Sequence, residues 1–302
     1  MSSIIDVRGL TKSFKEIIAV DDLTFTVKGK GVYGFLGQNG AGKSTTIRML
    51  LSLIRPTRGE IRIFDHDLST HRKEILQRIG AIIEKPDLYK YLTAIENLNL
   101  FATMSRLKLK RTQLMEKLEK VGLAERADSK IKTYSQGMKQ RLGIAVALVH
   151  DPDLIILDEP MNGLDPQGIA DIRELINHLS KEEGKTVFIS SHLLSEMEQV
   201  ADSLLIIHKG KKIAEGNMNE LLNPEQSRIE VETRSAKELE LLLKQTSWAN
   251  KIISINGSKI TMQMKREEVP IFVQQLTEMK QDIYSIQNKN SLEGYFLSLT
   301  SH

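Results

Sequence analysis

The chain has 302 residues, of which 40% are hydrophobic and 27% charged, so it can bury one large core and a second, smaller one. Its 42 basic residues nearly balance 39 acidic ones, and this formal net charge of +3 argues against a dedicated nucleic-acid binder. The absence of cysteine excludes disulfides, zinc–thiolate sites and thiol nucleophiles.

No segment of the sequence predicts passage through a membrane. The N-terminal residues MSSIIDVRGL lack a basic region followed by an apolar stretch, so we expect no signal peptide. The longest apolar run, Leu142–Val149, is much shorter than the ~20 residues that span a bilayer. We therefore expect a cytoplasmic protein that would reach a membrane only through a partner.

Strand-like and helix-like segments alternate through the first two-thirds of the chain. The predicted strands are Ile4–Val7, Leu23–Val27, Gly31–Leu36, Ile61–Phe64, Gly80–Ile83, Leu154–Leu157, Thr186–Ile189 and Leu204–His208. The predicted helices are Lys43–Ile54, Gln113–Val121, Gln136–Val149, Gly168–Ser180 and Leu193–Val200. Such alternation predicts βαβ units, a mainly parallel sheet and an α/β fold class.

Two regions depart from this alternation. Residues Lys85–Thr133 are rich in Leu, Lys and Glu, which predicts a mostly helical insertion, and we expect a helical subdomain at about 85–150. The core pattern ends near Asn217–Asn223, and NPEQS is typical of a linker. We therefore predict a main domain at 1–222 and a small α+β domain at 223–302.

The C-terminal domain is expected to mix strands and helices. Its predicted elements are strands at RIEVET, ISI, KITMQM and DIYSIQ and helices at Ala236–Leu243, Pro270–Met279 and Leu292–Leu299. We find no catalytic constellation in it, and Trp248 is predicted to belong to its core.

The strongest chemical signal is GQNGAGKST, which matches the phosphate-binding pattern G-x-x-x-x-G-K-[ST] between a predicted strand and a predicted helix. Glycines let the backbone N–H groups turn toward phosphate oxygens, and the helix N-terminus adds its positive dipole. Lys43 is expected to reach the β- and γ-phosphates, and the Ser44 hydroxyl to bind Mg²⁺. The predicted ATP-binding loop comprises Gly37, Gln38, Asn39, Gly40, Ala41, Gly42, Lys43, Ser44 and Thr45.

A second signal is LIILDEP, an apolar strand that ends in two acids. Ligands of parallel sheets bind at the carboxyl ends of the strands, where Asp158 and Glu159 are expected to lie. Asp158 would suit a Mg²⁺ contact and Glu159 the polarisation of an attacking water. Taken alone, the pair could equally be solvated turn residues, and the phosphate loop favours the catalytic interpretation.

The segment YSQGMKQRLGIAVALV resembles the signature sequence of the ATP-binding-cassette (ABC) ATPases, about 20 residues before the two acids. The family consensus LSGGQ corresponds here to Tyr134–Met138, in which Ser135 and Gly137 are kept and Gln136 differs. Without the family, this segment would be an amphipathic core helix with a serine cap. The resemblance implies that Ser135, Gln136 and Gly137 form a second phosphate clamp.

Further family motifs follow in the expected order over residues ~4–220. Gly163–Pro166 resembles the D-loop and implies a nucleotide contact for Asp165, while His192 resembles the switch histidine of the γ-phosphate. Phe14, 23 residues before Gly37, matches the aromatic residue that stacks on adenine. By themselves, a histidine at a strand end is usually incidental and Phe14 could be a core residue.

One position departs from the family. Glu84 follows the predicted strand at Gly80–Ile83, where the family usually has a glutamine that contacts Mg²⁺. A carboxylate can also bind Mg²⁺, so Glu84 joins Ser44 and Asp158 as a predicted metal ligand. This loop, the signature and the ending LEGYFLSLT resemble the ATPases of bacitracin- and lantibiotic-type exporters and immunity systems.

The resemblance implies an ATP- and Mg²⁺-dependent ATPase that forms a head-to-tail homodimer on binding ATP, with Glu159, His192 and Lys43 as the catalytic residues. It implies membrane-spanning permease subunits that dock near Glu84–Ile95 and hold the protein at the inner face of the cell membrane. The alternatives are a soluble ABC ATPase that acts on ribosomes or nucleic acid, and a regulatory module that only holds ATP. The first usually carries two cassettes or long coiled-coil arms, and the intact acids and His192 argue against the second.

Overall fold

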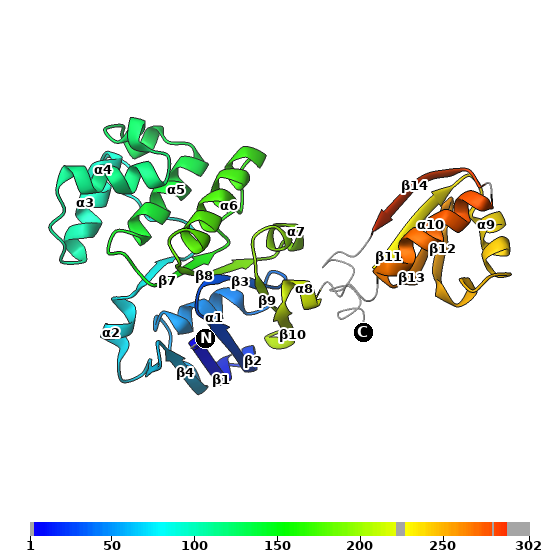
Figure 1. Ribbon diagram of the computed structural model, residues 1–302. Helices are drawn as coiled ribbons and strands as arrows, with labels where there is room; N and C mark the ends of the chain where they lie inside the picture. The colour runs from blue at the N-terminus through cyan, green and yellow to red at the C-terminus, as the bar shows by residue number, and fades with distance from the viewer. Residues whose placement is uncertain (1–2, 222–226, 280, 289–302) are drawn as a thin grey trace. The chain divides into compact units, whose positions relative to one another are not determined.

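The computed structural model describes residues 3–221, 227–279 and 281–288, and the chain divides after Gly216 into two compact units (Figure 1). The predicted terminal helix Leu292–Leu299 and nearly all of the predicted linker NPEQS lie outside the described residues. Among the described helices, none has the length and apolar character needed to cross a membrane.

The first unit is built on a six-stranded sheet with the order β10-β9-β3-β8-β7-β6. The strands are β3 (Gly31–Leu36), β6 (Ile79–Ile82), β7 (Leu154–Asp158), β8 (Thr186–Ser191), β9 (Ser203–His208) and β10 (Lys211–Asn217). The pairs β6–β7, β7–β8, β3–β8 and β3–β9 are parallel. Every residue of β7 is buried, as expected for a central strand covered on both faces. The α/β prediction is therefore confirmed.

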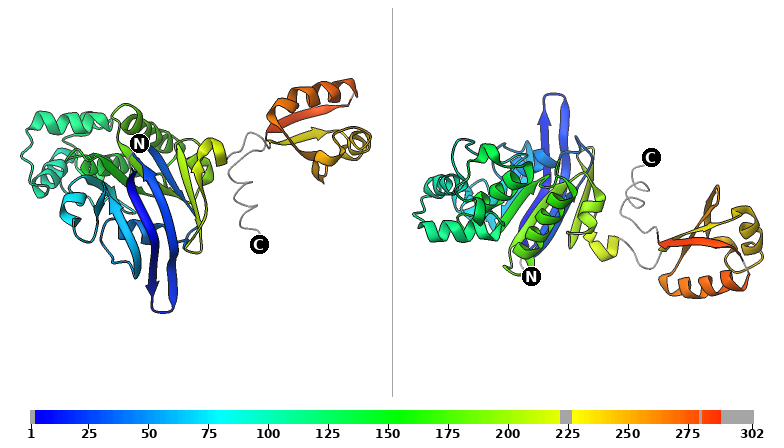
Figure 2. Two further views of the ribbon diagram at one scale, coloured as in Figure 1. Left: turned by 60° about the horizontal axis from the view of Figure 1, so that its bottom comes forward. Right: turned by 90° about the horizontal axis from the view of Figure 1, so that it is seen from above.

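A separate antiparallel sheet has the order β2-β1-β4-β5. It contains β1 (Ser3–Phe14), β2 (Ile17–Lys28), β4 (Arg58–Ile63) and β5 (His66–Asp67). The first, second and fourth strands of the sequence prediction lie in this sheet and not in the parallel one. Only Lys15 and Glu16 separate β1 from β2, and so short a connection makes an antiparallel hairpin, whereas parallel strands need a long crossover. Figure 2 shows this hairpin extending away from the helices.

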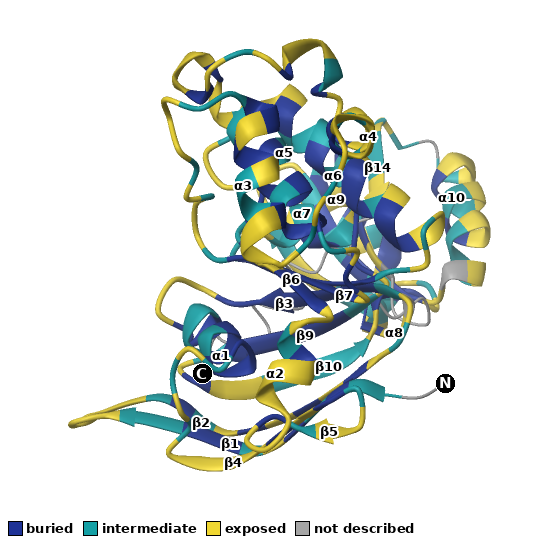
Figure 3. Ribbon diagram, turned by 90° about the vertical axis from the view of Figure 1, so that its left-hand side faces the viewer, coloured by how far each residue is buried: buried dark blue, intermediate teal, exposed yellow. Residues whose placement is uncertain are grey.

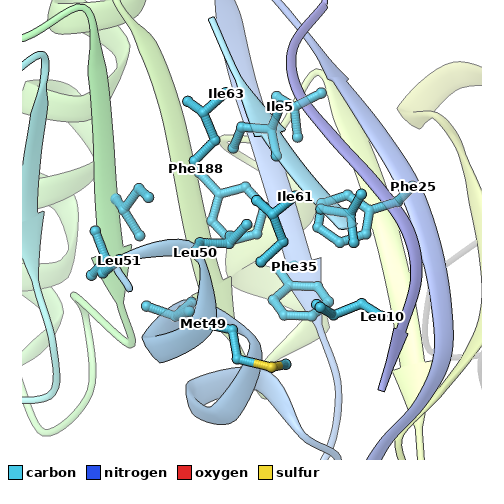
Figure 4. Close-up of a cluster of buried hydrophobic side chains, with 14 of the residues drawn as sticks. Ile5, Leu10, Phe25, Phe35, Met49, Leu50, Leu51, Ile61, Ile63 and Phe188 are labelled. Atoms are coloured by element: carbon cyan, nitrogen blue, oxygen red, sulfur yellow. The ribbon is translucent and has the colours of Figure 1, made fainter. Parts of the chain in front are cut away.

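The two sheets share one hydrophobic core, which Figure 4 shows in close-up. Phe25 from β2 packs between the sheets, with its ring centroid 6.1 Å from Phe35 of β3 and 6.3 Å from Phe188 of β8. Tyr33 stacks on Phe188 at 5.7 Å. This aromatic cluster fixes the antiparallel sheet against the strands that end at the candidate site.

Helices cover the parallel sheet and extend beyond it. They are α1 (Lys43–Leu50), α2 (Arg72–Leu76), α3 (Ala94–Met104), α4 (Arg111–Lys120), α5 (Gln136–Ala147), α6 (Pro166–Lys181) and α7 (Leu194–Glu198), with short 3₁₀ turns at Ala124–Arg126 and Ile131–Thr133. Helices α3, α4 and α5 pack on one another and form the predicted helical insertion, whose buried faces are dark in Figure 3. The short elements α2, β5 and β10 were not predicted, because none carries a long periodic pattern.

The second unit contains α8 (Met218–Leu221) and then a βαββαβ arrangement. Its elements are β11 (Ser227–Thr233), α9 (Ala236–Leu243), β12 (Ile252–Asn256), β13 (Lys259–Met264), α10 (Val269–Glu278) and β14 (Ile283–Asn288), with 3₁₀ turns at Ala249–Lys251 and Arg266–Glu268. The antiparallel sheet has the order β12-β13-β11-β14, which makes this unit ferredoxin-like. Trp248 packs edge-on against Phe272 in its core and donates a hydrogen bond to Gln275.

The aromatic core of the first unit gives a prediction for stability. Replacing Phe188 by Ala leaves a cavity among Phe25, Tyr33 and Phe35, so we expect the first unit to lose about 3–5 kcal/mol of its unfolding free energy. Urea unfolding followed by circular dichroism measures this loss. The fluorescence of Trp248, the only tryptophan, follows the second unit separately and should keep its midpoint. A Leu53→Ala variant, at an exposed position, is the matched control, and an equal shift in it would contradict the prediction.

Candidate functional site

The carboxyl ends of β3, β7 and β8 meet at one edge of the parallel sheet. In-register pairing sets Leu36 beside Ser191 and Asp158 beside Ser190, so the residues that follow these strands emerge together. The N–H of Gly37 donates to the carbonyl oxygen of Ser191 at 3.2 Å, which ties the start of the phosphate-type loop to the end of β8. The sequence-predicted loop, acidic pair and histidine therefore lie side by side.

The loop from Gly37 to Thr45 curls into the start of α1 at Lys43. Gly42 adopts a φ of 105°, and a Cβ there would lie 2.5 Å from the carbonyl oxygen of Ala19, so only glycine fits. Gly42 is also the N-cap of α1, which has no side-chain cap and no acid in its first turn. The first N–H groups of this helix therefore have no capping side chain, unlike those of α5 and α6, and present a positive end to an anion.

Lys43 is held at the centre of the loop, with only 5% of its surface exposed. Its Nζ donates to the carbonyl oxygens of Gly37 at 2.6 Å and Gln38 at 3.3 Å. The same Nζ lies 3.1 Å from Oε1 of Glu159, with which it forms an ion pair. The loop thus carries a fixed, buried positive charge that faces an acid at the end of β7.

Asp158 is 1% exposed, and one of its oxygens has no hydrogen-bond partner. Ser190 of β8 donates to Oδ1 at 2.5 Å, and its hydroxyl oxygen accepts the N–H of Glu159 at 2.9 Å. Oδ2 lies buried without a donor among the described residues. A buried carboxylate oxygen without a partner is costly unless a ligand, cation or water completes it. This oxygen is therefore suited to a metal ion.

Glu159 and His192 form a second contact across the strand ends. Nδ1 of His192 lies 2.8 Å from Oε2 of Glu159, so the tautomer protonated on Nδ1 donates to this carboxylate. Glu159 also has a positive φ of 51°, which is uncommon for a residue with a side chain. Such strain occurs at functional sites, where the surrounding structure holds it.

The turn that carries His192 is held by residues that the sequence analysis did not select. The hydroxyl of Ser191 accepts the N–H of Leu193 at 2.9 Å and donates to Oε2 of Glu196 at 2.6 Å. Burial raises the pKa of Glu196, which the hydrogen bond from Ser191 lowers and the nearby carboxylate of Glu159 raises further. In the sequence, the one signal for the Ser191–Glu196 contact is that an acid, Glu196, follows His192 by four residues.

The signature-like segment and the D-loop-like segment contact each other. Ser135 caps α5 by accepting the N–H of Met138 at 3.2 Å, as predicted for a serine cap. The amide of Gln136 donates to the carbonyl oxygen of Asn162 at 3.3 Å, next to Gly163. Asp165 caps α6 by accepting the N–H of Gly168 at 3.1 Å. A Cβ on Gly137 would touch only Gly168, at 4.0 Å, so this helix end has open backbone on its surface.

A cleft of about 490 Å³ joins these parts. Its lining includes the three sequence-predicted metal ligands, the acid predicted to be catalytic and a signature residue, namely Ser44, Glu84, Asp158, Glu159 and Gln136. The fold therefore brings together residues that lie more than one hundred positions apart in the sequence. Lys139 and Gln140 of α5 also line the cleft.

Two residues that the sequence analysis selected, Glu84 and Phe14, are far more exposed than Asp158 and Glu159. Glu84 lines the cleft, but its carboxylate accepts a hydrogen bond from Arg48 at 2.6 Å and is 64% exposed, and its φ of 61° is again positive. Phe14 lies at the tip of the β1–β2 hairpin opposite Ile17, is 47% exposed and does not line the cleft. A core role for Phe14 is therefore excluded.

Comparison with known proteins finds one family model, described as ABC transporter, that matches residues 20–162. A relative from Bacillus subtilis, the uncharacterized ABC transporter ATP-binding protein YhcH, is 39% identical over 99% of this chain and 97% of its own length. The bacitracin transport ATP-binding protein BcrA of Bacillus licheniformis is 48% identical over 81% of this chain and 80% of its own. The lantibiotic transport ATP-binding protein SrtF of Streptococcus pyogenes is 42% identical over 72% and 95%, respectively.

Among solved structures, the dimeric ATP-binding cassette MJ0796 in a post-hydrolysis state, bound to ADP and Pi, is similar to this chain with a TM-score of 0.65. It is 26% identical, and the match covers 71% of this chain and 98% of that one. These similarities confirm the resemblance that the ordered motifs indicated.

The hydrogen bonds of Ser190 give a prediction for stability. A Ser190→Ala variant leaves Oδ1 of Asp158 and the N–H of Glu159 buried without their partner, so we expect a loss of about 1–3 kcal/mol in unfolding free energy. Ser195→Ala, whose side chain makes no such buried contact, is the control. Equal unfolding midpoints for Ser190→Ala and the wild type would contradict this account of the strand ends.

The pKa of Glu196 gives a prediction for pH dependence. Since this pKa is raised above its ordinary value of 4.5, protonated Glu196 stabilises the fold at low pH, and this contribution is lost as pH rises through the folded-state pKa. Glu196→Gln keeps an acceptor for Ser191 without the charge. We therefore expect the variant to gain stability relative to the wild type as pH is raised from about 4 to about 7, measured by urea unfolding. A relative loss over this range would mean that the charged hydrogen bond outweighs burial.

Proposed function

The chain belongs to the ABC transporter family, as the ATPase subunit of a transporter, and from that premise we propose that it energises the export of antimicrobial peptides or related toxic compounds. The observation that carries the mechanism is the position of Glu159, held between Lys43 and His192 beside the unpartnered oxygen of Asp158. The choice of substrate rests on BcrA and SrtF, which are named for bacitracin and lantibiotic transport.

The residues at the strand edge fit ATP and a divalent cation. The uncapped end of α1 and the N–H groups from Gly37 to Thr45 would hold the phosphates, and Lys43 would contact them. Ser44 and Oδ2 of Asp158 would hold Mg²⁺, which requires oxygen ligands and supplies charge neutralisation at the reacting phosphate. Glu84 would join them after its carboxylate leaves Arg48.

Glu159 is placed to accept a proton from the attacking water. Its Oε2 is held by His192, and its Oε1 is paired with Lys43. Lys43 cannot serve this ion pair and a phosphate oxygen equally well, so its turn toward phosphate frees Oε1 to accept the proton. His192 then keeps the carboxylate oriented, while Lys43 neutralises charge that develops on the phosphate. The ion pair with Lys43 would therefore keep Oε1 of Glu159 from accepting a proton until nucleotide binds.

We place a second copy of the chain against the signature segment. The end of α5 at Ser135 and Gly137 has open backbone and lies beside the cap of α6 at Asp165, so it can offer N–H groups to a nucleotide held by the other copy. The dimeric state of MJ0796 supports this arrangement. Phe14 is exposed on its hairpin, with the Nζ of Lys12 4.9 Å from its ring centroid, and would stack on an adenine ring.

Permease docking is assigned to the segment Glu84–Ile95 and the start of α3. The side chains of Tyr89 and Tyr91 are exposed here, while Asn97 is fully buried and bonds both the N–H and the carbonyl oxygen of Tyr89. This anchoring gives a loop with exposed aromatic residues a fixed shape. Such a loop suits a cytoplasmic segment of a membrane-spanning partner, because aromatic anchors dominate protein interfaces.

Replacing Glu159 by Gln tests the catalytic assignment. The amide keeps the size of the side chain but cannot accept the water proton as a base, so we expect ATP turnover to fall by about 10²-fold or more with ATP binding retained. Phosphate release by the purified protein measures turnover, and gel filtration with ATP should show a stabilised dimer. Turnover close to that of the wild type would remove Glu159 from this role.

The transporter assignment is tested in membranes of the native host. The Glu159→Gln protein is affinity-purified with ATP and Mg²⁺ after gentle solubilisation, and a stoichiometric polytopic membrane protein is expected. Deleting that partner should then raise sensitivity to a peptide antibiotic. Recovery of ribosomes or nucleic acid without a membrane protein would favour the soluble alternative and overturn the proposal.

A further inference from the structure

Three metal-binding side chains gather on the surface of the first unit, away from the nucleotide cleft. They are His66 of β5, His71 at the start of α2 and Glu74 within α2. One ligand atom from each lies within 4.8 Å of the others, and all three residues are exposed, as the yellow colour of β5 and α2 in Figure 3 shows. In the part of the chain that the structure describes, no other group of three histidine or acidic residues meets so closely.

The backbone fixes the two histidines relative to each other. His66 follows a two-residue hairpin, in which Phe64 and Asp65 both have positive φ angles, and pairs with Ile63 of β4. The N–H of His71 donates to the carbonyl oxygen of Asp67 at 2.9 Å. This turn returns the chain on itself and sets the imidazole ring centroids 5.0 Å apart.

His71 is oriented by a hydrogen bond that leaves its other nitrogen available. Nδ1 lies 2.8 Å from the hydroxyl oxygen of Thr70, which in turn lies 3.4 Å from the carbonyl oxygen of Asp67. When the Thr70 hydroxyl donates to Asp67, its oxygen accepts the Nδ1 proton of His71, and Nε2 keeps its lone pair. This is the arrangement in which a metal-ligating histidine is held by a second hydrogen bond.

Glu74 completes the set from the same helical turn. It lies in the first turn of α2, whose N-cap is His71, so the two residues are three positions apart at the same helix end. Two arginines of this surface are bonded to other groups, because Arg72 donates to the hydroxyl of Ser52 at 3.0 Å and Arg62 to the carbonyl oxygen of Asp65 at 2.7 Å.

We propose that His66, His71 and Glu74 bind one Zn²⁺ ion at the surface of the nucleotide-binding unit. Two imidazoles and one carboxylate are a zinc donor set, with a water in the fourth position, whereas Mg²⁺ prefers oxygen ligands. Atoms around tetrahedral zinc lie roughly 3.4 Å apart, so these exposed side chains must approach one another by up to about 1.4 Å through side-chain rotations. Because the fourth coordination position is open and the three side chains are exposed, we expect Zn²⁺ to bind reversibly.

The test is isothermal titration of the untagged, full-length protein with ZnCl₂ in millimolar Mg²⁺. One Zn²⁺ per chain is expected for the wild type, and its loss is expected in His66→Ala and in His71→Ala. Thr70→Val, which removes only the orienting hydroxyl, should weaken binding about tenfold. Substitution of Co²⁺ should give the visible absorption bands of a tetrahedral ion.

Two control variants separate this site from other histidines. His178→Ala removes an exposed histidine that lies 3.6 Å from a single acid, Glu183, and His192→Ala removes the histidine of the nucleotide site. Both should bind Zn²⁺ as the wild type does. Stoichiometric binding that survives His66→Ala with His71→Ala, or that is lost in either control, would overturn the proposal. Circular dichroism of each variant verifies that it is folded.

Discussion

The functional part of this protein depends on the parallel, in-register pairing of β3, β8 and β7. That pairing places Gly37, Asp158 and His192 at one edge of the sheet. The hydrogen bond from Gly37 to Ser191 joins the end of β3 to the end of β8. Each strand is buried, so its register is set by packing, in particular by Phe35 and Phe188 in the shared aromatic core. A shift of one residue would turn every one of these side chains to the opposite face.

The site contains buried charged and polar groups whose burial costs free energy, and a nucleotide and a metal ion would offset that cost. An uncapped helix end and a buried lysine lie at the start of α1, and a buried carboxylate oxygen without a donor among the described residues lies at the end of β7, at the same edge of the sheet. The ion pair between Lys43 and Glu159 offsets part of the cost of these charges in the structure without ligands. Because the same lysine suits a phosphate, in the proposed function this pair links nucleotide binding to release of Glu159.

Glu84 and Glu159 both have positive φ angles, which are uncommon for residues with a side chain and which occur at functional sites. Both residues follow parallel strands and both line the cleft, yet neither is a glycine. The α5 end is also specialised, because Gln136 contacts Asn162 beside the left-handed Gly163 and so joins two motifs within one subunit. These details adapt a common nucleotide-binding architecture to a signature segment that departs from the usual family consensus.

The sequence by itself determined the family and most of the elements, because fixed spacings of Gly, Lys, Asp, Glu and His form ordered motifs that are specific to that family. It also predicted α9, β3 and β13 to the residue, since α9 has helical periodicity, β13 alternates and β3 is a short apolar run bounded by glycines. Tertiary structure alone decided that β1, β2 and β4 form a separate antiparallel sheet, because local patterns do not reveal a strand's partner. It alone showed that Ser190 bonds Asp158 and Glu159, that Glu196 supports the turn carrying the histidine, and that Glu84 pairs with Arg48. Contacts between residues distant in sequence produce no fixed spacing in the sequence. They can therefore be identified only from the structure, in which the strands are paired.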